Sequence, residues 1–254
     1  MANIFIHACR TILFCFYMLI LTFLQPSPAA ATKVEPSRSD LPWPSGVFTS
    51  SATSLALETW RGRPVDIETL FFGTTTWTHM ISSAGVLKKK LPGLPSRLIV
   101  ALGMLPVDHW GQLEQCAAGR FDPFIHALTA AMLNHGAAAA AASGKPVLIR
   151  LGWEANAVDS NYPWGVTGDG TSWRACFRRW VDILNPITNS ATSPPTRQKN
   201  FLIVWNMANR GTIDYPIENL WPGDAYVDIV GSQFYDRCPP LPAGNEAEWD
   251  RRLN

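Results

Sequence analysis

The sequence has no strong excess of charge of either sign. Lysine and arginine total 21, aspartate and glutamate total 20, and the formal net charge of the 254-residue chain is +1 at pH 7. A nucleic-acid-binding surface normally shows a basic stripe. The basic cluster at residues 88–90 is instead typical of a solvated helix end. The charge pattern therefore predicts no nucleic-acid partner.

Sequence signals for nucleotide and metal sites are also missing. No glycine-rich loop follows any run expected to be a strand, which argues against a dinucleotide or phosphate site. The cysteines lie far apart without a C-x-x-C pair, and His79 and His109 lack ligand partners at the spacing of a metal site. We therefore expect neither a cofactor nor a metal ion.

The N-terminus has the composition of a targeting segment. Arg10 precedes an apolar run over residues 12–24, and an Ala-x-Ala pattern ends at Ala31. These features predict a signal peptide over residues 1–31 and a secreted or periplasmic protein without a membrane partner after cleavage. The apolar run is shorter than the roughly 20 residues that span a bilayer, and an uncleaved anchor is the alternative. Residues 32–45, rich in proline and serine, are interpreted as a linker.

Cysteines after the predicted cleavage site allow one disulfide. They are Cys116, Cys176 and Cys238. An exported chain favours oxidation of one pair, and the sequence leaves the pairing open.

From residue 46 onward, apolar runs alternate with helical patterns. Strands are expected over residues 46–50, within 62–73, and over 97–106, 146–153, 201–209 and 226–236. Strands that are apolar throughout and alternate with helices form a parallel sheet. Residues 46–254 are therefore predicted to be one α/β domain of the (β/α)8 TIM-barrel type, incomplete because only about six units are present. A doubly wound sheet is the alternative.

The spacing of apolar residues and breakers also predicts helices. They are expected over residues 79–90, over 121–142 with Asp122 as the N-cap, and from the cap Ser172 to the Asn185-Pro186 pair. In the last of these, the apolar residues share one face. They are Trp173, Phe177, Trp180, Val181 and Leu184.

Polar and aromatic residues gather where the expected strands end, which is the edge that carries the active site in parallel α/β folds. The central stretch is residues 145–165, KPVLIRLGWEANAVDSNYPWG. Its apolar run ends at a lone carboxylate, Glu154, among aromatic and amide side chains. Such a carboxyl group, desolvated by aromatic rings, is typical of a proton donor in glycosidic bond cleavage.

Each residue at these strand ends has a structural alternative. Glu154 either donates a proton or pairs with Arg150 inside the sheet, and Asn156 either binds sugar hydroxyls or closes the turn. Indole rings stack on the apolar faces of sugars, whereas tryptophans on a helix face belong to the core. The candidate substrate-binding residues are Trp153, Asn156, Trp164, Trp205, Asn206 and Asp236.

Three segments resemble glycoside hydrolase family 26, the group of endo-β-mannanases and related endoglycanases. They are RLGWEANAVDSNYPWG, LIVWNMAN and LWPGDAYVDIVGSQFYD. The resemblance implies a (β/α)8 barrel with retaining chemistry, Glu154 as the acid/base, and Tyr235 as the residue that orients the nucleophile. It also matches Trp164 to the tryptophan that follows the family's acid/base segment. We therefore expect a monomer that acts on a polysaccharide, β-1,4-mannan or a related β-glycan.

The sequence departs from the family pattern at two points. Trp153 stands where family members have histidine before the acid/base. The family's nucleophile, a glutamate at the end of strand seven, has no counterpart, because none of the later acids ends a seventh apolar strand. Retaining cleavage needs two carboxyl groups about 5–5.5 Å apart. The expectation is therefore a chain truncated before its nucleophile, with a non-catalytic polysaccharide-binding or accessory protein of envelope polysaccharide metabolism as the alternative.

Overall fold

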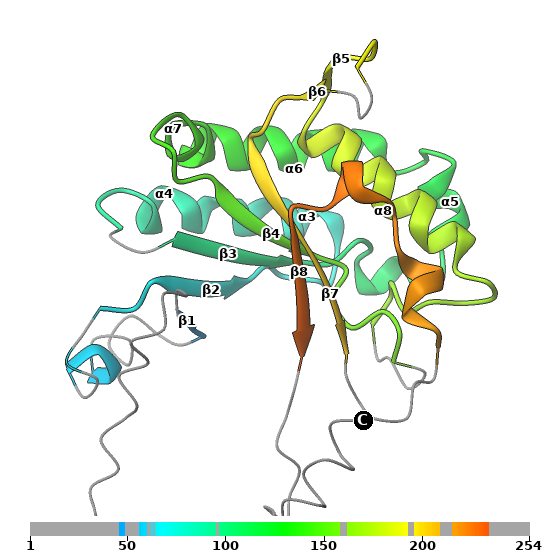
Figure 1. Cartoon of the computed structure of the whole chain (residues 1–254), viewed down its shortest axis with the longest axis horizontal. Coiled ribbons are helices and arrows are strands. Elements are labelled where there is room, and N and C mark those ends of the chain that lie inside the picture. Colours follow the sequence, from blue (N-terminus) through cyan, green and yellow to red (C-terminus); the bar gives the residue numbers. More distant parts are fainter. Residues whose placement is uncertain are drawn as a thin grey trace, which may run out of the picture. The chain divides into compact units, whose positions relative to one another are not determined.

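A six-stranded parallel sheet organises the described part of the chain (Figure 1). Its strands, in spatial order, are β1 (Gly46–Val47), β2 (Ile67–Phe71), β3 (Arg97–Leu102), β4 (Val147–Leu151), β7 (Phe201–Ala208) and β8 (Ile229–Gln233). Every neighbouring pair is parallel. Spatial order follows chain order throughout, so the described sheet lacks the reversal that defines a doubly wound fold. The predicted α/β class is confirmed, and the six described strands form an open sheet rather than a closed barrel.

The computed structural model describes residues 46–48, 56–59, 62, 64–94, 97–157, 162–192, 196–208 and 215–233. The predicted signal peptide and linker, residues 1–45, lie outside these ranges. So do Tyr235, Asp236 and Cys238. Within the described ranges, no helix combines the length and the apolar character needed to span a membrane.

The helices that follow β2 lie on one side of the sheet (Figure 1). They are α3 (Trp77–Ser83), α4 (Leu87–Lys90), α5 (Leu113–Ala117), α6 (Asp122–Met132), α7 (Ala138–Ala142) and α8 (Thr171–Leu184). Strand residues that face them, such as Val100, Ile149 and Ile203, are at most 1% exposed. Because successive strand side chains point to opposite faces, the residues between them form a second face, on which Ile99 and Leu202 are only half-buried.

Shorter elements connect the main ones. The 3-10 helices are η1 (Ala84–Val86), η2 (Val107–His109), η4 (Ile217–Leu220) and η5 (Asp224–Tyr226). Strands β5 (Ile187–Asn189) and β6 (Thr196–Arg197) form a separate antiparallel pair between α8 and β7.

The helix predicted over residues 121–142 is interrupted. A π-helical segment, η3 (Leu133–Ala137), separates α6 from α7, and Gly136 within it has φ 117°, a value that glycine adopts without steric cost. Asp122 is not the N-cap but the first residue of α6. Its carboxylate accepts two hydrogen bonds from Arg179 on α8, and this pairing raises the pKa of Arg179. A tertiary partner has replaced the predicted capping role.

Helix α8 confirms the predicted apolar face, since Trp173, Phe177, Trp180, Val181 and Leu184 are all buried. Its start differs from the prediction. Gly170, with φ 73°, is the N-cap, and Asp169 Oδ1 accepts a hydrogen bond from the Thr171 N–H at 2.9 Å. Ser172 therefore lies inside the helix.

A disulfide joins α8 to α5. Cys176 pairs with Cys116, with the two Cα atoms 5.2 Å apart. The structure thus selects one of the pairings that the sequence left open, and it links two helices on the same side of the sheet.

Candidate active site

The turn after β4 places Glu154 at the carboxyl end of the sheet. Glu154 has φ 55° and is the one non-glycine residue with positive φ among the described residues. Such a conformation costs on the order of 1–3 kcal/mol and is concentrated at functional sites. The Glu154 N–H donates to the Asn206 carbonyl at 3.0 Å, which fixes the turn against β7.

The carboxyl group of Glu154 is buried and has a hydroxyl partner. Glu154 is 8% exposed, and the Tyr162 hydroxyl donates to its Oε2 at 3.2 Å. Arg150 Nε donates instead to Asn206 Oδ1 at 2.9 Å. The ion pairs formed between described residues do not include one between Arg150 and Glu154. The structural alternative proposed for Glu154 is therefore not the arrangement observed.

Asn206 connects the two neighbouring strands to this turn. Its side-chain Oδ1 accepts the hydrogen bond from Arg150, and its backbone carbonyl accepts the one from the Glu154 N–H. Asn206 is 7% exposed. In the register of β7 and β8 it lies opposite Gly231, where an added Cβ would come within 2.9 Å of Asn206 Nδ2. Gly231 thus leaves the space that the Asn206 side chain fills. In this structure Asn206 positions other site residues, and its predicted contact with substrate stays a prediction.

Asn156 closes the turn. Its Nδ2 donates to the Ala208 carbonyl at 2.9 Å, and its Oδ1 accepts from the Ala208 N–H at 2.8 Å. The side chain therefore imitates a strand backbone at the end of β7, and Asn156 is 4% exposed. Both polar ends of the amide are engaged, which favours the structural alternative over contact with sugar.

The tryptophans predicted to bind sugar are all buried. Trp153, Trp164 and Trp205 are 4%, 1% and 6% exposed. Trp164 Nε1 donates to the Trp153 carbonyl at 2.9 Å, and the absence of a side chain at Gly103 leaves space for the Trp164 ring. A stacking platform has to be exposed, so this burial argues against the predicted platform role of Trp164.

Trp205 lies on the wrong face of the sheet for its predicted role. It precedes Asn206 in β7, and adjacent strand residues point to opposite faces. Asn206 points toward Arg150, so Trp205 points toward the helix-covered side. There it packs edge-on against Trp221, with ring centroids 5.2 Å apart.

Two exposed aromatic rings belong to a series of ring contacts that leads to Glu154, and neither is among the residues predicted from the sequence. We call the four rings of Phe48, Phe71, Trp153 and Tyr162 the aromatic ladder. Successive ring centroids are 4.9, 5.4 and 5.4 Å apart, and Phe48 and Phe71 are 66% and 44% exposed. The register of the strands would have pointed to Phe71. Phe71 and Arg150 both pair with Ala101, so their side chains lie on the same face of the sheet.

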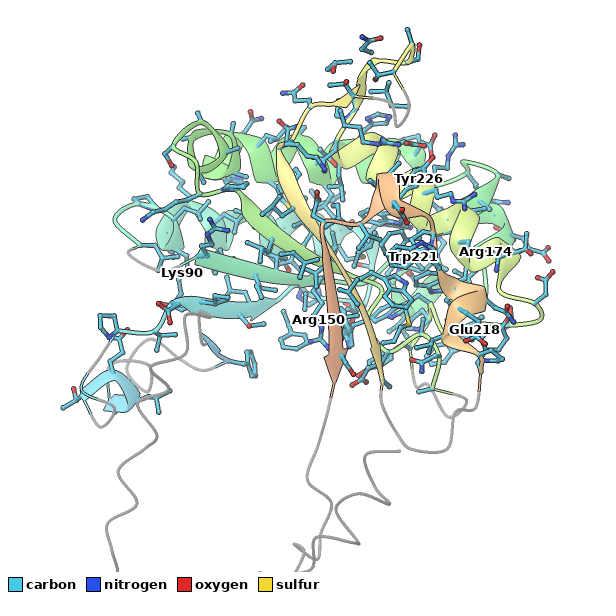
Figure 2. All side chains as sticks on the ribbon, viewed as in Figure 1. Lys90, Arg150, Arg174, Glu218, Trp221 and Tyr226 are labelled. Carbon is cyan, nitrogen blue, oxygen red and sulfur yellow. A yellow bond between two sulfur atoms is a disulfide. The ribbon has the colours of Figure 1, made fainter. Side chains whose placement is uncertain are left out.

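The Arg150 guanidinium lies near two rings of the ladder. Its Cζ lies 6.0 Å from the centroid of the Phe71 ring and 5.5 Å from that of Trp153. Arg150, labelled in Figure 2, lies on β4, and the register aligns it with Val204 on β7 and Ile229 on β8. A guanidinium at this distance from aromatic rings is attracted to their faces.

No protein-family model matches the sequence, and no curated protein matches it. Among solved structures, a GH26 β-mannanase from Bacteroides ovatus, BoMan26A, is similar with a TM-score of 0.39 and 12% sequence identity. The match covers 67% of this chain and 53% of that enzyme, so the chain spans about half of its length. A TM-score of this size does not establish the family.

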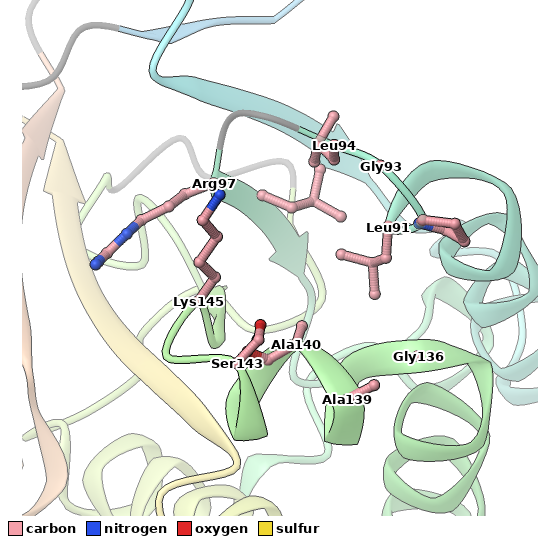
Figure 3. Close-up of a pocket in the computed structure, with 11 residues that line it drawn as sticks. Leu91, Gly93, Leu94, Arg97, Gly136, Ala139, Ala140, Ser143 and Lys145 are labelled. Carbon is pink, nitrogen blue, oxygen red and sulfur yellow. The ribbon is translucent and has the colours of Figure 1, made fainter.

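Other candidate sites lie elsewhere or are absent from the described residues. In those residues, no group of three or more His, Cys, Asp or Glu side chains is arranged to hold a metal ion. A cavity of about 510 Å³ opens at the amino ends of β3 and β4, beside Arg97 and Lys145 (Figure 3). Leu91 and Leu94 line it on one side and the alanines of α7 on the other. It is separated from Glu154 by the length of the strands.

Proposed function

We propose that the chain is a glycoside hydrolase of the (β/α)8-barrel type that acts on β-1,4-mannan or a related β-glycan. The observation that carries the proposal is the placement of Glu154, a buried carboxyl group on a strained residue at the carboxyl end of a central parallel strand. Active sites of barrel enzymes form at this end. The unreversed strand order and the one-sided helix layer support the barrel type, and the three segments that resemble family 26 support the substrate class.

In the proposed reaction, Glu154 gives its proton to the glycosidic oxygen as the bond to the sugar breaks. It then takes a proton from the water that completes hydrolysis. The Tyr162 hydroxyl donates to Oε2, so it stabilises the carboxylate that remains after proton transfer. The hydrogen bond from the Glu154 N–H to Asn206 holds the backbone in the strained conformation that directs the carboxyl group.

Retaining cleavage also needs a second carboxyl group about 5–5.5 Å away. Within the described residues, the hydrogen-bond partner of the Glu154 side chain is Tyr162, and no carboxylate is paired with it. Trp153, which stands where family members have histidine, favours a second candidate function, in which the chain binds polysaccharide without cleaving it. Tyr235, proposed to orient the nucleophile, and Asp236 lie outside the described residues.

We also propose that the mature protein is secreted or periplasmic. The Cys116–Cys176 disulfide supports this location, because disulfides persist in oxidising compartments. The monomeric state is a further proposal of the same kind.

Release of reducing ends from mannan, β-glucan and xylan tests the hydrolase proposal. The wild-type protein is expected to act on at least one of them, and Glu154→Gln should lower the rate about 10²–10⁴-fold, as expected for loss of a general acid. Glu218→Gln is the matched control, because Glu218 is an exposed glutamate on η4 and should leave the rate unchanged.

The contrary result is a folded wild-type protein that releases no sugar from any of the three substrates. Calorimetry with oligosaccharides then decides on the second candidate function. Binding by both the wild-type and the Glu154→Gln proteins would support a binding protein, and no binding would reject both functions.

A further inference from the structure

The exposed rings of the aromatic ladder belong to phenylalanines rather than tryptophans. Phe71 is 44% and Phe48 66% exposed, whereas Trp153, the next ring of the aromatic ladder, is 4% exposed. Large apolar side chains that are exposed together are unusual on a monomer surface and often mark a binding site. A ligand that stacks near Glu154 would therefore meet Phe71 and Phe48 before it meets an indole.

Phe71 is held in place from several sides. Phe48 packs edge-on against it with ring centroids 4.9 Å apart, and Trp153 does so at 5.4 Å. Arg150 lies 6.0 Å from its ring centroid and is itself fixed by the hydrogen bond to Asn206. A ring immobilised before binding loses little conformational freedom when a ligand arrives.

The register explains how Arg150 and Phe71 come together across three strands. Phe71 pairs with Ala101, and Ala101 pairs with Arg150, so the three side chains form one row on the same face. Ala101 in the middle is short, which leaves space above it for the guanidinium group to approach the Phe71 ring. A larger residue at this position would separate the two.

The ladder also connects Phe71 to the candidate acid. Trp153 packs against Tyr162 at 5.4 Å between centroids, and the Tyr162 hydroxyl donates to Glu154. The exposed rings and the carboxyl group are thus linked by a continuous chain of side-chain contacts. The rings of Tyr162 and Trp153 lie between Glu154 and Phe71 along this series. A ligand that contacts both Glu154 and Phe71 therefore has to be longer than a single small group.

We propose that Phe71, supported by Phe48, is a stacking platform for a sugar ring of the polysaccharide at a position beyond the bond next to Glu154. This inference rests on the proposed function. Phenylalanine offers no hydrogen-bonding group, so the platform favours a ring with an apolar C–H face, as β-1,4-linked neutral hexoses have. The affinity gained from Phe71 therefore depends on oligosaccharide length, because only longer chains reach the platform.

Calorimetry with β-1,4-linked manno-oligosaccharides of increasing length, from disaccharide to hexasaccharide, tests this platform. The full chain with Glu154→Gln serves as the non-cleaving background. Phe71→Ala in that background should weaken binding of the longest oligosaccharides roughly tenfold, as for loss of one anchor residue, and leave the shortest unchanged. Phe71→Tyr should keep the affinity, because it keeps the ring.

Phe124→Ala is the matched control. Phe124 is 41% exposed, close to the value for Phe71, but it lies on α6 and stacks on Trp77 with ring centroids 5.3 Å apart. This substitution should not change the affinity for any oligosaccharide. Equal affinities of the Phe71→Ala and background proteins at every length would overturn the platform and leave the proposed function standing.

Two other outcomes also count against the platform. A uniform loss at all lengths, shared by Phe124→Ala and accompanied by a lower Tm, would indicate a structural role for Phe71. Failure of the background protein to bind any length, together with no cleavage of aryl glycosides by the wild-type protein, would reject both the platform and the proposed function. Cleavage of short aryl glycosides does not need the platform, so it separates the two failures.

Discussion

The two faces of the sheet differ in how far their side chains are buried. On the helix-covered face, Val100, Ile149 and Ile203 are at most 1% exposed. On the second face, the centre is also buried, with Val204 6% exposed, but exposure rises to 44% at Phe71. The second face also carries the charged Arg150. Because side chains alternate along each strand, one face packs against the helices while the other exposes Phe71.

Removal of one large ring from each side of the sheet should show the difference between the two faces most clearly. Trp180 on α8 is fully buried, and its Nε1 donates to the Met104 carbonyl at 3.1 Å. Trp180→Ala should lower the free energy of unfolding by about 3–5 kcal/mol. Phe71→Ala should lower it by less, because the Phe71 side chain is already 44% exposed. Urea unfolding of both variants measures the difference, and similar losses would contradict the proposed division of roles.

A substitution at Gly103 tests how the core supports the site. A Cβ at this position would overlap the Trp164 ring, whose Nε1 holds the Trp153 carbonyl. Gly103→Ala should therefore destabilise the protein by about 1–3 kcal/mol and weaken oligosaccharide binding, because Trp153 belongs to the ladder.

The control for Gly103 is Gly85→Ala, since an added Cβ at Gly85 meets no atom within 4 Å. This variant should unfold at the wild-type Tm or slightly above it. If Gly103→Ala behaved in the same way and kept full binding, Trp164 would not be the element that holds Trp153 in place.

The smallest expected effect concerns the start of α8, away from both faces of the sheet. The Thr171 N–H donates to Asp169, and this hydrogen bond lowers the pKa of the Asp169 carboxyl below its usual value of 3.8. A carboxyl group with a lower pKa in the folded state stabilises the fold above the unfolded-state pKa, and this contribution is lost as pH falls through the folded-state pKa.

Asp169→Ala should therefore lower the Tm slightly at pH 7 and by a smaller amount in acid below the usual carboxyl pKa. Thermal unfolding at several pH values checks this, with the exposed Glu218→Ala as the control. A Tm difference that stays the same at every pH would show that the ionised carboxylate is not the stabilising group.

The sequence predicted the strands and the apolar face of α8 because both depend on local patterns. Apolar runs gave β3, β4 and β7, and helical spacing gave the buried face that includes Trp173 and Trp180. The start of α6 was predicted incorrectly, because Asp122 has a distant partner in Arg179. The break at Gly136 was hidden by the alanines that follow it, which favour a continuous helix.

The candidate site was predicted less completely than the fold. The position of Glu154 follows from the end of an apolar run, whereas its backbone strain and its Tyr162 partner depend on a turn that the sequence does not specify. Trp205 was selected for its residue type without regard to strand alternation. Phe71 was not predicted as a site residue. Its contact with Arg150 joins strands two places apart in the sheet and residues 79 positions apart in the chain (71 and 150), which no local pattern reveals.

The central claim is that Glu154 donates the proton to the departing oxygen. Its most direct test compares wild-type and Glu154→Ala proteins on two aryl β-glycosides, one with a strongly acidic phenol that departs without protonation and one with a weakly acidic phenol that needs it. The account predicts that Glu154→Ala loses most of its activity on the second substrate and keeps bond cleavage on the first. An equal loss on both substrates, or no loss on either, would contradict it.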